Sequence, residues 1–306
     1  MVKRRGGVTF FPPPRSYLRR MLTRVSFLLT GAGHGRPFEV DATYRATGRA
    51  KPVVVFVHGF KGFKDWGHFS LLADFFAERG FVYVKLNLSH NGLVVGGTGD
   101  LEDLDAFADN NFSIELDDIG QLLDALFVPG ATPLPAAELD PERLGLVGHS
   151  RGGGLVLLKA AEDPRVRAVV TWAGIAEVHP HWPQAVFDEW QRTGLLHVPN
   201  LRTGQPLPMR YQIVDDYHQH RLRLDIAHNV RKHLHQPLLL VHGDEDEVVA
   251  VAALDALHQL RPDAEVLLVP GATHMFGGAH PWPDPALPEP AQLVAECTAD
   301  FFQRRL

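Results

Sequence analysis

From about residue 53 onward, short apolar runs rich in β-branched residues alternate with segments whose apolar residues recur at helical spacing. The first run, VVVFVHG at 53–59, is continuous enough for a strand buried on both faces. Similar runs follow at 81–88, 143–149, 166–174, 237–243 and 264–272. Helical patterns lie at 68–80, 112–127, 151–162, 250–260 and 290–304. This alternation predicts an α/β fold with a mostly parallel central sheet and helices on both faces.

Two departures from this pattern suggest how the domain is organised. Upstream, RVSFLLTG and FEVDATYRA predict an antiparallel pair of strands at one edge of the sheet. Between Gly174 and Pro237 lie 62 residues, about twice the ~30 of a simple crossover unit. The aromatic residues of this connection argue against disorder. We therefore expect a domain over residues 25–306 with an inserted cap at about 175–236.

The N-terminal segment, residues 1–24, has a different composition. It holds seven Lys and Arg residues, and no acid occurs before Glu39. Prolines and arginines interrupt the apolar stretch that a secretory signal needs. We expect a basic tail, either disordered or the product of a start site placed too far upstream, and an organelle-targeting leader is the alternative. The single cysteine, Cys297, fits a reducing compartment, so we expect a cytoplasmic protein.

Charge and hydropathy exclude two classes of function. The formal net charge of −6 argues against a nucleic-acid binder, which needs an excess of Lys and Arg. No apolar run approaches the length of a membrane span, so we expect no stable membrane insertion. A small-molecule substrate is the partner that remains.

The segment GLVGHSRGGGLVLL places Ser150 between glycines, after a strand pattern and before a helix pattern. Residues 148–152 fit G-x-S-x-G, in which a sharp turn exposes the serine above the sheet and the helix N-terminus offers free N–H groups to an oxyanion. The alternative is that Ser150 only caps the helix. The strand before it, the glycines around it and the helix after it favour a nucleophile.

A nucleophilic serine needs a base and an acid that orients the base. The strand at 237–243 ends in a carboxylate cluster that includes Asp244 and Asp246, and the strand at 264–272 is followed by His274. Because catalytic groups on such sheets lie at the C-terminal ends of strands, we expect these side chains at one edge. His280, in a Pro-rich loop, is the rival base, and the order Ser, Asp, His is that of α/β-hydrolases.

On these motifs the chain resembles an α/β-hydrolase of the serine esterase and peptidase type, over roughly residues 25–305. The motifs are VHGFKGFKDW, GHSRGG, HGDEDEVV and GATHMF. The resemblance implies a triad of Ser150, His274 and Asp246, since Asp246 occupies the last position of G-x-x-D, with Asp244 as the alternative. It also implies an oxyanion hole made by the backbone N–H groups of Phe60 and Arg151.

Aromatic residues near these motifs are candidates for substrate contact. They are Phe63 and Trp66 after the first strand and Trp182, Phe187 and Trp190 in the expected cap. Each has an alternative role, in packing against the first helix or within the cap. We select Phe63, Trp182 and Trp190 as substrate-binding residues. Arg202 either meets a substrate carboxylate or forms a structural ion pair, and we favour the ion pair.

The remaining histidines and glycines give weak signals. Three H-x-H pairs, at 179/181, 218/220 and 233/235, lack the further ligands that a zinc site needs, so we expect no metal. The glycine clusters GAGHG and GGTGD do not fit a dinucleotide-binding pattern, so we expect no cofactor; GGTGD reads as a mobile loop at the site's mouth. His58 is expected to pack within its loop, and His149 to orient the serine turn or touch the pocket wall.

The sequence thus predicts a serine hydrolase that cleaves carboxylic esters through an acyl-enzyme intermediate. A hydrolase of small peptides or amides with the same triad is the alternative. A non-catalytic binding protein on the same fold is a third hypothesis, which the complete set of triad candidates disfavours.

Overall fold

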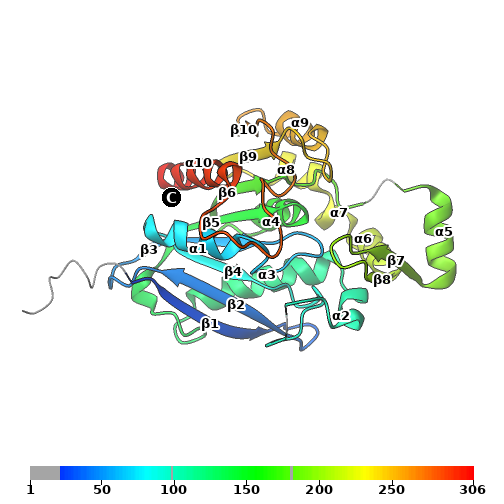
Figure 1. The fold of residues 1–306 in the computed structure, drawn as a ribbon, viewed down its shortest axis with the longest axis horizontal. Helices are drawn as coiled ribbons and strands as arrows, with labels where there is room; N and C mark the ends of the chain where they lie inside the picture. The colour runs from blue at the N-terminus through cyan, green and yellow to red at the C-terminus, as the bar shows by residue number, and fades with distance from the viewer. Residues whose placement is uncertain (1–20, 98, 180–181) are drawn as a thin grey trace, which may run out of the picture.

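The computed structural model describes residues 21–97, 99–179 and 182–306 (Figure 1). Its central sheet has eight strands, in the spatial order β1 (Thr23–Thr30), β2 (Pro37–Tyr44), β4 (Val82–Leu86), β3 (Lys51–Val57), β5 (Leu139–His149), β6 (Val166–Trp172), β9 (Leu238–Gly243) and β10 (Glu265–Val269). Neighbours from β4 to β10 are parallel, whereas β2 is antiparallel to both β1 and β4. The predicted sheet and its antiparallel edge are confirmed.

The first strand begins near the expected start of the domain. Residues 1–20 of the predicted basic tail lie outside the described residues. Strand β1 begins at Thr23, two residues before the expected start of the domain, and pairs with β2 along its whole length.

Helices cover both faces of the sheet because its central strands are apolar on both sides. In β3, Val53, Val55 and Val57 belong to one hydrophobic cluster, while Val54 and Phe56 belong to another. Residues of α3 (Phe112–Phe127), α4 (Arg151–Glu162), α8 (Ile226–Lys232) and α9 (Ala252–Leu260) belong to the first cluster. Residues of α1 (Phe69–Glu78) and α10 (Glu289–Arg305) belong to the second.

The long connection between β6 and β9 carries its own secondary structure. It contains α5 (Gln184–Thr193), β7 (Leu195–Pro199), β8 (Pro206–Arg210), α6 (Gln212–Gln219), α7 (Arg221–Leu224) and α8. In Figure 1, α5, α6 and the β7–β8 hairpin stand to one side of the sheet. We call residues 175–236 the cap segment.

Contacts both within the cap segment and to the rest of the domain fix its position. Nε1 of Trp190 donates to the carbonyl of Met209 at 2.8 Å, which joins α5 to β8. Arg210 pairs at 2.9 Å with Asp105 in α2 (Leu104–Ala108). Among the helices of the described residues, none combines the length and apolar content needed to cross a membrane.

The parallel strands determine where chemistry can occur. Because β3, β5, β6, β9 and β10 run in one direction, the segments that follow them emerge at the same edge of the sheet. The G-x-S-x-G turn, the carboxylate cluster and His274 all lie in such segments.

Candidate active site

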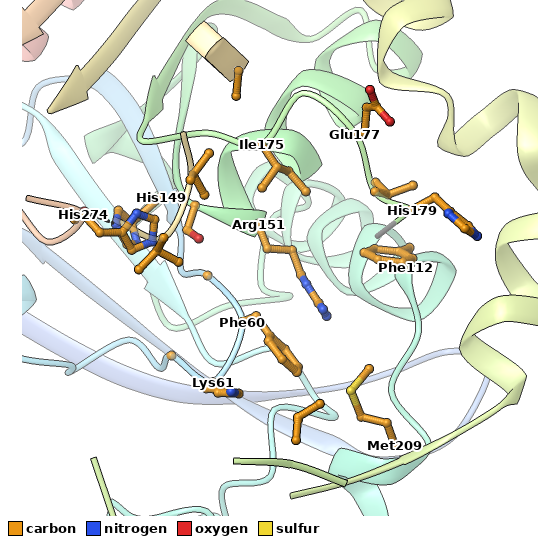
Figure 2. Close-up of a pocket in the computed structure, with 18 of the residues that line it drawn as sticks. Phe60, Lys61, Phe112, His149, Arg151, Ile175, Glu177, His179, Met209 and His274 are labelled. Atoms are coloured by element: carbon orange, nitrogen blue, oxygen red, sulfur yellow. Dashed lines mark hydrogen bonds between the residues drawn. The ribbon is translucent and has the colours of Figure 1, made fainter. Parts of the chain in front are cut away.

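A cavity of about 1070 Å³ lies at this edge, between the strand ends and the cap segment. Phe60 follows β3, Ser150 follows β5 and His274 lies beyond β10, and all three line the cavity. Trp182 and Trp190 line it from the cap segment. Figure 2 shows Phe60, Arg151 and His274 around this space. A mostly apolar cavity with a few convergent polar groups is the usual form of a small-molecule site.

Ser150 has a backbone conformation that a helix cap does not require. Its φ is 57° and its ψ is −120°, a region that costs a non-glycine residue roughly 1–3 kcal/mol. Its N–H donates to the carbonyl of Trp172 at 2.8 Å, and its carbonyl accepts from Gly153 at 2.9 Å. Although Ser150 precedes α4, its side chain makes no capping hydrogen bond. The capping explanation of this serine therefore loses its main support.

Two glycines allow the turn to pack this closely. A Cβ on Gly148 would lie 2.1 Å from the carbonyl oxygen of Gly152. A Cβ on Gly59 would lie 2.8 Å from Cβ of Ser150. Real Cβ atoms do not approach so near, so the loop after β3 can reach Ser150 only because Gly59 has no side chain.

Asp246 and His274 form a direct pair. Nδ1 of His274 lies 2.8 Å from Oδ2 of Asp246, and Nε2 of His242 lies 3.3 Å from the same oxygen. The other oxygen, Oδ1, accepts the N–H groups of Val248 and Val249, each at 2.8 Å. Burial opposes ionisation of this carboxyl, but the hydrogen bonds outweigh burial and hold the pKa of Asp246 well below its usual range. Asp246 is thus a fixed anion beside the imidazole.

The two rivals to this pair have other partners. Asp244 is exposed, and its Oδ1 accepts the N–H of Gly271 at 2.6 Å. His280, the rival base in the Pro-rich loop, also lines the cavity, and its Nδ1 accepts the N–H of Gly67 at 2.8 Å. The geometry therefore favours His274 over His280 and Asp246 over Asp244.

Two further histidines support the loops around Ser150. Nε2 of His149 donates to the carbonyl of His274 at 2.9 Å, and burial lowers the pKa of His149 to about 3. His58 is buried within its loop, between the carbonyl of Gly59 at 2.9 Å and the N–H of Leu88 at 3.2 Å. Burial lowers the pKa of His58 to about 4. Both imidazoles are therefore neutral at pH 7, and they add no positive charge near His274.

The amides of Phe60 and Arg151 remain the candidates for an oxyanion hole. Arg151 is the first residue of α4, so its N–H has no acceptor within the helix and lies at the positive end of the helix dipole. Phe60 directly follows Gly59, the residue whose backbone approaches Ser150. Both residues line the cavity.

The three aromatic residues selected for substrate contact differ in position. Trp182, 37% exposed, and the buried Trp190 line the cavity. Phe63 is not among the cavity-lining residues: it is 5% exposed and packs edge-on against His280, with ring centroids 5.0 Å apart. Trp66 lines the cavity instead, because the chain turns between these two aromatics.

Other expectations about the cap segment concern Phe187 and Arg202. Phe187 is buried and stacks on Trp190, which is the packing role. Arg202 lines the cavity but pairs with Asp100 at 2.5 Å, which is the structural ion pair that we favoured. Asp100 ends the GGTGD loop, of which residue 98 lies outside the described residues.

No group of three or more His, Cys, Asp or Glu side chains in the described parts of the chain is arranged to hold a metal ion. His181, from one of the H-x-H pairs, lies outside those parts.

Sequence reasoning missed three side chains at the site. His242 contacts Asp246, and it stands directly before the glycine of G-x-x-D. The side chains of Lys61 and Arg151 also line the cavity. Both are charged residues within the motifs VHGFKGFKDW and GHSRGG, and this was the signal that could have found them. From the sequence, we expected a function only for the backbone N–H of Arg151.

The fold and this edge define an α/β-hydrolase. The structure is similar to Est1E from Butyrivibrio proteoclasticus, with a TM-score of 0.62 and 19% identity, covering 90% of this chain and 98% of that one. It is similar to alpha/beta hydrolase domain-containing protein 10 from mouse, with a TM-score of 0.66 and 18% identity, covering 92% and 99%. The family model described as the prolyl oligopeptidase family (Peptidase_S9) matches residues 67–281. The chain belongs to this family, and the protein is a hydrolase.

A relative in sequence carries an esterase name. The Bacillus subtilis (strain 168) protein named "Putative esterase YitV" is 28% identical over 209 residues, which are 67% of this chain and 72% of that protein.

Proposed function

We propose that this hydrolase cleaves carboxylic esters through a Ser150–His274–Asp246 triad and an acyl-enzyme intermediate. One observation carries the proposal. Ser150, with a strained backbone and no capping bond, lines the same cavity as His274, whose Nδ1 is bonded to the buried anion Asp246. This combination supplies a nucleophile, a base and the group that fixes the tautomer of the base.

The chemistry follows from these roles. Oγ of Ser150 attacks the acyl carbon while Nε2 of His274 takes its proton. Asp246 keeps the other proton on Nδ1 and stabilises the imidazolium that forms. The N–H groups of Phe60 and Arg151 bind the oxyanion. His274 then protonates the leaving alcohol, and water attacks the acyl-enzyme by the same route.

This mechanism requires one movement. Within the described residues, Oγ of Ser150 makes no hydrogen bond, so its bond to Nε2 of His274 has to form, by rotation or approach of the side chains, when substrate binds. Catalytic hydrogen bonds are often long without substrate and shorten in the complex.

The charges in the cavity favour esters over aminopeptidase substrates. An aminopeptidase needs carboxylates that converge on the substrate amine. Glu177 is the single carboxylate among the described lining residues. Two further acids of the cap segment, Asp188 and Glu189, bond to Gln184 and Arg192 on α5. The esterase name of YitV agrees with this choice.

Amide hydrolysis is the second candidate, because the matched family is named for oligopeptidases. The test compares release of 4-nitrophenol from 4-nitrophenyl butyrate with release of 4-nitroaniline from aminoacyl 4-nitroanilides. We expect a rapid burst with the ester and far slower release from the amides. Faster amide cleavage would favour the second candidate.

The control is Ser150→Ala. We expect this variant to lose the burst and to resist labelling by a fluorophosphonate probe that labels the wild-type protein. Equal turnover by both proteins would remove Ser150 from the mechanism. A folded wild-type protein that neither labels nor hydrolyses would instead be a binding protein.

A further inference from the structure

Arg151 and Lys61 bring two positive charges into a cavity that is otherwise mostly apolar. We infer that the substrate is an ester that carries a carboxylate, and that this carboxylate binds to the side chains of Arg151 and Lys61. The inference rests on the proposed esterase function and adds the substrate class.

The balance of charge along the cavity wall points to an anion. The lining residues with permanent charge are the cations Lys61, Arg151 and Arg202 and the carboxylate Glu177. Arg202 is paired with Asp100 at 2.5 Å. Among the described residues, Lys61 forms no ion pair, and Arg151 forms a single one, with Glu115.

That contact leaves most of the guanidinium available. Nη1 of Arg151 lies 3.4 Å from Oε1 of Glu115, a long ion pair, and the same oxygen accepts Nδ2 of Asn110 at 2.6 Å. A guanidinium has five N–H donors in a fork that matches a carboxylate. Glu115 therefore orients Arg151 but leaves donors for a second carboxylate.

Aromatic rings hold the guanidinium in place. Its Cζ lies 4.0 Å from the ring centroid of Phe60 and 4.9 Å from that of Phe112. Figure 2 shows the Arg151 side chain extending into the pocket between these two rings. The side chain is 13% exposed, so the charge is largely shielded from bulk water. A cation held this way loses little freedom when an anion binds.

Lys61 brings a second positive charge to the same ring. Its Nζ lies 5.2 Å from the centroid of Phe60 and donates to the carbonyl of Pro199 at 2.7 Å. Burial, reinforced by the charge of Arg151, lowers the pKa of Lys61. A carboxylate near these two cations would relieve their repulsion, and an ammonium has donors left for it.

The test compares two pairs of esters by kcat/KM. In the first, mono-4-nitrophenyl adipate carries a carboxylate on the acyl side and 4-nitrophenyl hexanoate is its neutral match. In the second pair, 3-carboxyphenyl hexanoate carries the carboxylate on the alcohol side, and phenyl hexanoate is its neutral match. Since hydrogen bonds to charged groups are strong, we expect one anionic ester to be favoured about 10- to 100-fold. The favoured pair identifies the side that carries the charge.

Arg151→Met and Arg202→Met are the matched variants, because both remove one positive charge from the same cavity wall. We expect Arg151→Met to abolish the preference and Arg202→Met to keep it, whatever either does to the absolute rates. If wild type shows no preference in either pair, or if both variants alter the preference equally, the inference is wrong while the esterase function stands.

A binding measurement separates this inference from failure of the esterase function. Ser150→Ala, which cannot form an acyl-enzyme, is titrated with monoethyl adipate and with ethyl hexanoate in a calorimeter. The site is supported if monoethyl adipate binds more tightly than ethyl hexanoate and if this difference is lost when Arg151→Met is added. This result supports the site even if the wild-type protein hydrolyses neither ester. Equal binding, together with equal kcat/KM in both pairs, overturns it.

Discussion

Replacing Asp246 by asparagine tests the role of the buried carboxylate with little change of shape. Asparagine can keep its Oδ1 on the N–H groups of Val248 and Val249, which Asp246 now binds at 2.8 Å. Its NH₂ group then faces Nδ1 of His274. Because two donors cannot face each other, His274 must move its proton to Nε2, the atom that should accept the proton of Ser150.

Two losses add in Asp246→Asn. Opposite charges about 4 Å apart attract by about 4 kcal/mol at an effective dielectric constant of about 20, which corresponds to about 10³ in rate. The wrong tautomer adds to this, so we expect kcat to fall by about 10³ to 10⁴. The fold should survive, because the backbone bonds to Oδ1 remain.

The assay is steady-state hydrolysis of 4-nitrophenyl butyrate, with circular dichroism to check folding. Asp244→Asn is the matched control, and we expect its kcat to stay within about threefold of wild type, as for most exposed substitutions. Retention of more than about a tenth of kcat by folded Asp246→Asn would refute the reasoning, since a tautomer error cannot be so mild. A large loss in Asp244→Asn alone would move the acid to that residue.

Gly59→Ala should lower kcat for 4-nitrophenyl butyrate by about 10²-fold, because the new Cβ would lie 2.8 Å from Cβ of Ser150 and displace the proposed oxyanion loop; unchanged kcat would contradict this. Burial is the largest cause that lowers the pKa of His58, His68, His90 and His149 to about 3 or 4. Because these pKa values lie below the value of about 6.5 for an unfolded chain, the unfolded chain binds more protons than the folded one between these pH values. The free energy of unfolding should therefore fall as the pH drops from about 6.5 to 4, by up to about 1.4 kcal/mol per pH unit for each histidine. A free energy of unfolding, measured with urea, that stays constant over this range would count against this prediction. Trp190→Phe leaves the carbonyl of Met209 without its donor, so we expect a loss of about 1–3 kcal/mol by urea unfolding, and an unchanged midpoint would argue against that bond.

The sheet and its helices could be predicted because each has a strong local signal. The pattern at 112–127 coincides with α3, whose first turn is capped by the side chain of Asn111. The hairpin of β7 and β8 was missed because it contains Pro199, Pro206 and Pro208, and prolines usually argue against strands. Tertiary packing overrides that local preference here.

The site residues that lie in a sequence motif could be predicted. The residues whose orientation depends on the conformation of a loop could not. The G-x-S-x-G motif indicated Ser150, and the ends of the following predicted strands indicated Asp246 and His274. The sequence could not show which of Phe63 and Trp66 faces the cavity, because that depends on the intervening turn. Lys61 has a φ of 62°, a conformation that a lysine rarely adopts and that no sequence pattern announced.

The cap segment leaves the sheet after β6 and returns at β9, and these two strands are neighbours. Its two points of attachment therefore lie side by side. The part of the segment before α8, a helix that packs in the main core, can be lengthened, shortened or exchanged without rearranging any strand of the central sheet. Ser150, Asp246 and His274 all lie outside it. Evolution, or an engineer grafting a new segment between Gly174 and α8, can thus re-line one wall of the cavity while the proposed catalytic groups stay in place. Preference for a charged ester would persist through such an exchange, because Arg151 and Lys61 belong to the part that does not change.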